Sequence, residues 1–166
     1  MRKLVLGVAA LAMLAGPAPA SAGPLLELSV GSGFRFQPKT IERIPTNLML
    51  TGGYSFAGTL KLELGAVANL GDVENSDFEV DLRPMVVVAP PAFPVYLRAI
   101  LGVTGLVDGP RDINYGGALG WDLGALGVGV FIEAGALSRR IEVPTATGTA
   151  KDTVWIAEGR IGGYWD

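Results

Sequence analysis

The feature that most constrains the fold is an alternation of apolar residues with polar residues or glycine, which recurs with a period of two from residue 25 onward. The run Leu60–Leu70 (LKLELGAVANL) is typical. This period predicts β-strands, because successive side chains of a strand point to opposite faces. No apolar run after residue 22 reaches the ~20 residues of a membrane helix. The alternating segments are Leu25–Phe36, Leu48–Phe56, Leu60–Leu70, Phe78–Val88, Phe93–Thr104, Ile113–Leu123, Leu126–Leu137 and Thr153–Trp165.

The connections between these eight segments alternate in length. Strands of about 9–11 residues cross a membrane when tilted, and long loops on one side with tight turns on the other are typical of outer-membrane barrels. We therefore predict an all-β fold, an eight-stranded antiparallel up-and-down transmembrane β-barrel formed by residues 23–166. The longer or more polar connections are Gln37–Asn47, Gly71–Asp77, Val107–Asp112 and Ser138–Asp152. The short ones are Ala57–Thr59, Ala89–Ala92 and Gly124–Ala125.

The first 22 residues have the three parts of a secretory signal peptide. Met1–Lys3 is positively charged, Leu4–Leu14 is almost wholly apolar, and the small residues Ala20–Ala22 follow. The apolar run is about half the length that spans a membrane. We expect a cleavable signal peptide at residues 1–22, with cleavage after Ala22. Loss of its two basic residues takes the formal charge from −3 to −5, which argues against nucleic-acid binding.

Three observations predict that the apolar face of the barrel points outward. Glycines gather on the polar face, where an eight-stranded interior has little room for side chains. Ten of the thirteen aromatic residues fall in two outward bands, as membrane interfaces require, whereas Tyr96, Phe131 and Tyr164 fall inward. All charges within the strands lie opposite the apolar face, and we expect Pro84 to distort its strand. These charges are Glu27, Arg35, Lys61, Glu63, Glu79, Asp81, Arg83, Arg98, Asp122, Glu133, Glu158 and Arg160.

In this architecture the chain resembles the small eight-stranded outer-membrane β-barrels, such as the transmembrane domain of the outer-membrane protein A family. The resemblance covers residues 23–166 and rests on strand pattern and loop lengths. It implies residence in the outer membrane of a Gram-negative bacterium, among lipid and lipopolysaccharide. It also implies insertion by the barrel-assembly machinery and a monomeric state. The aromatic residue of the C-terminal strand, Trp165, is penultimate here, whereas such barrels usually end on one.

Six of the inward charges are expected near mid-barrel from their positions along the strands. The first interpretation is an ion-pair network that fills the lumen and satisfies buried charges. The alternative is a gate, in which exchange of ion pairs opens a narrow ion path. We favour the filled lumen because eight strands leave little free space. The six residues are Glu63, Arg83, Arg98, Glu133, Glu158 and Arg160.

The chain has no His and no Cys, which excludes His-based triads, thiolate nucleophiles and zinc–thiolate sites. Glu79 and Asp81 share a strand face but lack any accompanying catalytic motif. The acidic run Gly71–Asp77 departs from calcium-loop spacing. We therefore predict no enzymatic activity, no metal and no cofactor.

Arg139 and Arg140, in the last long connection, are candidate contacts for lipopolysaccharide phosphates, with two solvated rim charges as the alternative. The expected role of the barrel is structural or surface-interactive. Two alternatives stay open: a narrow, porin-like pore for ions or small solutes, and a soluble secreted lipocalin-like barrel that binds an apolar ligand.

Overall fold

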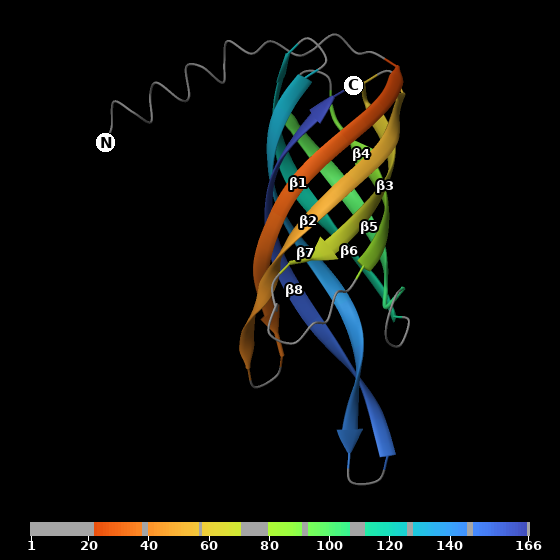
Figure 1. Cartoon of the computed structure of the whole chain (residues 1–166), viewed down its shortest axis with the longest axis vertical. Helices are drawn as coiled ribbons and strands as arrows, with labels where there is room; N and C mark the ends of the chain where they lie inside the picture. Colours follow the sequence, from red (N-terminus) through yellow and green to blue (C-terminus); the bar gives the residue numbers. More distant parts are fainter. Residues whose placement is uncertain are drawn as a thin grey trace, which may run out of the picture.

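Eight consecutive antiparallel strands close into one barrel in the computed structural model (Figure 1). The strands are β1 (Gly23–Phe36), β2 (Ile41–Phe56), β3 (Leu60–Asn69), β4 (Val80–Val88), β5 (Val95–Thr104), β6 (Asp112–Ala125), β7 (Val128–Thr145) and β8 (Gly148–Trp165). Each strand pairs with its neighbour in sequence, and β8 pairs with β1. This confirms the predicted all-β, eight-stranded up-and-down barrel.

The structure describes residues 22–37, 40–56, 58–70, 80–90, 93–106, 112–125, 128–145 and 148–165, with backbone alone at 125 and 141–151. The expected signal peptide lies outside these residues except for Ala22, as do Glu79 and the acidic run Gly71–Asp77. Among the described residues, no helix is long and apolar enough to cross a membrane.

The period-two pattern sets which side chains face outward. On β3, Leu62 and Leu64 are 48% and 52% exposed, whereas Lys61 and Glu63 between them are 9% and 6% exposed. The apolar face is therefore the outer one, as predicted and opposite to a soluble barrel. Nine of the ten aromatics expected to point outward lie among the described residues, and all are exposed: Phe34, Phe36, Tyr54, Phe56, Phe93, Tyr115, Trp121, Trp155 and Trp165.

Pro84 interrupts a ladder without shifting its register. Strand β4 pairs with β5 at Leu82↔Val103, and the pairing resumes in the same register at Met85↔Ile100. On its other side Pro84 stays opposite Leu64 of β3. The expected distortion is thus a local loss of pairing. A register shift occurs instead on the β1–β2 pair, between Gly31 and Gly33.

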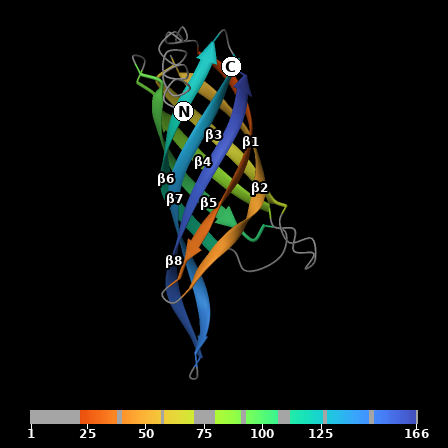
Figure 2. The same ribbon diagram turned by 90° about the vertical axis from the view of Figure 1, so that its left-hand side faces the viewer.

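Two connections expected as loops are largely strand. Strand β2 already begins at Ile41, within the expected loop Gln37–Asn47. Strands β7 and β8 stay paired through most of Ser138–Asp152, up to Thr145↔Gly148. Figure 2 shows them continuing together as a two-stranded ribbon past the ends of the other strands. Alternation fades in this segment because a ribbon outside the barrel has no core-facing side, and so the sequence pattern missed it.

Two apolar clusters fill parts of the barrel interior. Along β5 the inward side chains run from Tyr96 near the tight turns through Arg98 to Ile100. Tyr96 belongs to a cluster at the turn end, formed by Leu25, Val87, Tyr96, Phe131 and Tyr164. Ile100 belongs to a cluster nearer the loops, formed by Met49, Val67, Met85, Ile100, Ala118 and Leu137. Charged side chains lie between and around these two clusters.

The three aromatics predicted to point inward are therefore part of the core. Tyr96 and Phe131 pack edge to face with ring centroids 6.4 Å apart. The Tyr96 and Tyr164 hydroxyls donate hydrogen bonds to Glu133 and Asp122, at 3.0 and 2.8 Å. Both phenols thus bury their rings and still satisfy their polar ends.

Candidate functional site

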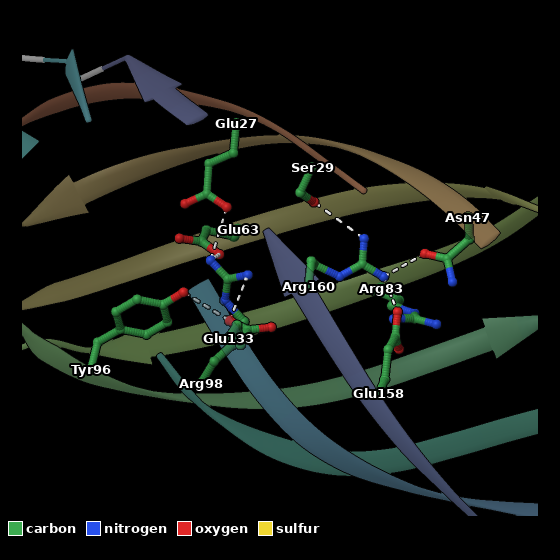
Figure 3. A network of polar contacts seen from close by, with 10 residues as sticks. All are labelled: Glu27, Ser29, Asn47, Glu63, Arg83, Tyr96, Arg98, Glu133, Glu158 and Arg160. Carbon is green, nitrogen blue, oxygen red and sulfur yellow. Dashed lines mark hydrogen bonds and ion pairs between the residues drawn. The ribbon is translucent and has the colours of Figure 1, made fainter. Parts of the chain in front are cut away.

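Arg98 of β5 is the centre of the first group of lumen charges (Figure 3). Its guanidinium lies 2.9 Å from the carboxylate of Glu27, 3.1 Å from that of Glu63 and 3.1 Å from that of Glu133. These partners come from β1, β3 and β7, so a single side chain ties together strands from across the barrel. The Tyr96 hydroxyl also donates to Glu133.

Glu158 of β8 is the centre of the second group. Arg83 of β4 donates to one of its carboxylate oxygens at 3.0 Å, and Arg160 donates to the other. Arg160 also donates to the Ser29 hydroxyl at 3.2 Å and to the Asn47 side-chain oxygen at 2.6 Å. Figure 3 shows both groups projecting from the wall into one interior.

The two groups have opposite charge imbalance. The group around Arg98 has three carboxylates and one guanidinium, and the group around Glu158 has two guanidinium groups and one carboxylate. Glu63 forms an ion pair with Arg98, and among the described residues its two carboxylate oxygens accept no hydrogen bond. A buried charge is costly unless it is paired, so each arginine compensates carboxylates that are nearly inaccessible to water.

Little free space is left inside. A cavity of about 10 Å³ lies between the two groups, next to Arg83, Glu133 and Glu158. That volume holds about one water molecule. Gly31 shows how tightly the lumen is packed, because a Cβ at this position would lie 2.8 Å from a Glu158 oxygen and 2.9 Å from an Arg160 nitrogen. This fits the expectation that small residues on the inner face make room for long charged ones.

The structure places all six residues expected near mid-barrel inside the lumen, where they are 3–8% exposed. It adds four that the sequence analysis did not assign to the network. Glu27 and Tyr96 are both predicted to point inward, but neither is among the residues expected near mid-barrel. Ser29 is uncharged, so only its place on the polar face of its strand could indicate it, and Asn47 falls in the connection Gln37–Asn47 that is expected as a loop.

Arg139 and Arg140 are separated by the pleat of β7. Arg139 is half-buried and stands opposite Asn114 and Val154, which are both buried and face inward. Arg140 is exposed on the outer face, opposite Thr153. Of the two candidate lipopolysaccharide contacts, only Arg140 is on the outer face.

Clustered metal ligands are absent from the described part of the chain. It holds no group of three or more Asp, Glu, His or Cys residues that could bind a metal ion. Of the acid pair considered for hydrolysis, Asp81 is buried in the lumen, while Glu79 lies outside the described residues. The candidate site is therefore the set of paired charges inside the barrel.

No protein-family model matches the sequence, and no curated protein matches it. Two solved structures have a similar fold. The crystal structure of Neisserial surface protein A (NspA) matches with a TM-score of 0.53 and 12% identity, over 87% of this chain and 98% of that chain. The N-terminal β-barrel domain of Pseudomonas aeruginosa OprF matches with a TM-score of 0.49 and 10% identity, over 87% of this chain and 100% of that domain. The likeness to NspA supports, for the fold, the resemblance to small eight-stranded outer-membrane barrels.

Proposed function

We propose that this chain is a non-conducting outer-membrane β-barrel with a structural or surface-interaction role. The observation that supports it is the distribution of polarity. Leucines on the outer wall are about half exposed while the charges of the same strands are buried. In water this arrangement would expose a continuous apolar surface, which soluble monomers avoid. In a bilayer it is the arrangement of a membrane barrel.

The filled lumen favours the structural role over the narrow pore. The apolar cluster around Tyr96 and Phe131 closes the turn end, and the cluster around Met49 and Met85 lies beyond the Arg98 group. An ion would have to cross both clusters and separate buried ion pairs on the way. The packing also argues against the apolar ligand of a lipocalin-like barrel, since the cavity beside Arg83 and Glu133 in the described part of the barrel is only about 10 Å³.

The surface most available to a partner is the β7–β8 ribbon. Strand β1 pairs with β8 as far as Trp155, and β6 pairs with β7 as far as Arg139. Beyond these points, the pairing found among the described residues is that of β7 with β8. We propose that this ribbon and the loops beside it form the exposed surface of the anchored barrel, on the side away from the tight turns.

Two measurements test the proposal. The full-length protein should fractionate with detergent-extracted outer membranes and should migrate differently on gels before and after boiling, because a folded barrel resists the detergent. Reconstituted in a planar bilayer, it should show no steady conductance. Recovery from the soluble periplasm would contradict the membrane assignment, and regular single-channel steps from the wild type would contradict the closed lumen.

A further inference from the structure

The outer wall of the barrel has a shallow groove across β5, β6 and β7. Its volume is about 600 Å³, and it is widely open along the wall rather than enclosed. Its floor includes small residues in register, with Ala99 opposite Gly117 and Gly117 opposite Ala136. Ala157 of β8, opposite Ala136, continues this row beyond the groove. Leu97 and Leu119 line its turn side.

Aromatic residues bound the groove on its loop side. The next outward row places Tyr115 opposite Ser138 and Ser138 opposite Trp155. Tyr115 and Trp155 are each 55% exposed, whereas Ser138 between them is 2% exposed. The two exposed aromatics thus flank the buried serine on the outer wall, as in the aromatic girdles of membrane barrels.

Arg140 lies just beyond this aromatic row. It is exposed on the same face of β7 as Ser138 and Ala136, and it lies four positions beyond Ala136 along the strand, a rise of about 13 Å. Half of the hydrocarbon core of a bilayer is about 15 Å thick. A lipid whose headgroup contacts Arg140 would therefore lay its acyl chain along the groove.

From this arrangement we infer that the outer wall of β5–β8 binds one lipid A moiety of lipopolysaccharide, with a phosphate on Arg140 and an acyl chain on the floor of small residues. Lipid tails have no hydrophobic preference for a protein wall over other tails, so selectivity must come from shape and charge. The groove offers closer van der Waals contact than a wall of leucines, and Arg140 offers a charge-assisted hydrogen bond to an anionic headgroup. The inference rests on the proposed outer-membrane placement, which puts the loop side in the leaflet that carries lipopolysaccharide.

The test compares three variants of the full barrel in phosphatidylcholine nanodiscs that contain a small fraction of lipid A. Arg140→Ala removes the headgroup contact, and Ala136→Leu fills the groove. Ala66→Leu is the matched control, because Ala66 is an exposed alanine on the outer face of β3, on another part of the wall. Lipid A retained per barrel is counted by native mass spectrometry. A parallel series replaces lipid A with phosphatidylglycerol at the same mole fraction.

We expect wild type and Ala66→Leu to retain lipid A equally. Arg140→Ala should retain about fivefold less, the size of one partly exposed charged contact. Ala136→Leu should also retain less lipid A, because the added side chain occupies the groove that the acyl chain would fill. Equal retention by all variants would overturn the inference. If the wild type retains phosphatidylglycerol and lipid A equally, the choice of lipid A is overturned. Chemical cross-linking is run in parallel, and dimers that form in every sample except Ala136→Leu would assign the groove to a second copy of the chain. Heat-modifiable migration is recorded for every sample. Its absence in the wild type would refute the membrane barrel itself, whereas intact barrels without lipid A preference would refute only the groove.

Discussion

Removing the guanidinium of Arg98 should be among the most destabilising single changes in the lumen. Arg98 has ion pairs with three carboxylates at 2.9–3.1 Å, and its side chain is only 2% exposed. In Arg98→Met the side chain keeps most of its apolar length, but Glu27, Glu63 and Glu133 remain buried without their shared cation. Breaking one buried ion pair in this way costs about 3–5 kcal/mol. Because three buried carboxylates would lose their cation, the loss of unfolding free energy should be at the upper end of that range.

The assay is reversible urea unfolding of the barrel from phospholipid vesicles, followed by tryptophan fluorescence and by heat-modifiable migration. The matched control is Arg35→Met, because Arg35 forms a half-exposed ion pair with Glu42 at 3.9 Å. Exposed pairs contribute about 0–1 kcal/mol, so this variant should unfold close to wild type.

A double variant distinguishes unpaired charge from lost packing. Arg98→Met combined with Glu63→Gln removes one of the three unpaired buried charges, so it should recover part of the stability lost in Arg98→Met. If Arg98→Met unfolds within about 1 kcal/mol of wild type, buried charge pairing does not contribute as argued. No recovery in the double variant would mean that the loss comes from packing instead.

Three further predictions concern other parts of the molecule. Gly120→Leu should cost about 1–3 kcal/mol in the same assay, since a Cβ there would meet the Tyr96 ring, while Gly52→Leu, with nothing within 4 Å, should be near neutral. Equal effects of the two would contradict the inward placement of Gly120. Replacing residues 142–151 with an Asn-Gly turn should leave barrel stability within about 1 kcal/mol, because an isolated two-stranded ribbon is marginal by itself; a large loss would show that the ribbon supports the barrel. N-terminal sequencing of the protein from outer membranes should start directly after Ala22, and an intact Met1 would contradict the cleaved signal peptide.

The sequence predicted best what depends on one strand at a time. Alternation identified which face of each strand is apolar, and it placed Tyr96, Phe131 and Tyr164 inward even though they did not fit the aromatic bands. It also placed Glu27 on the inner face. In each case the prediction depends only on whether a residue is at an odd or an even position of its own strand, and neighbouring residues in the sequence are enough to decide this.

Pairing between distant strands could not be read in the same way. Arg98 meets Glu27 across 71 residues of chain, and Arg160 meets Ser29 across 131. Which charges meet depends on strand register, tilt and closure, and these follow from the whole barrel. The division into a carboxylate-rich and an arginine-rich group is for that reason a result of the structure alone. The extension of β7 and β8 escaped prediction for a different reason, since a ribbon in water needs no alternation.

The seam between β1 and β8 has a consequence for how such a chain reaches its native state. The strands meet from Leu26 opposite Trp165 to Phe36 opposite Trp155, so the final ladder joins residues more than a hundred positions apart in sequence. Contacts of this separation form slowly, because a long segment must be ordered before they contribute. Until the seam closes, both of its strands present unpaired backbone groups that invite pairing with other chains. We therefore expect closure to be a late step, and aggregation to compete with it while the sheet is open.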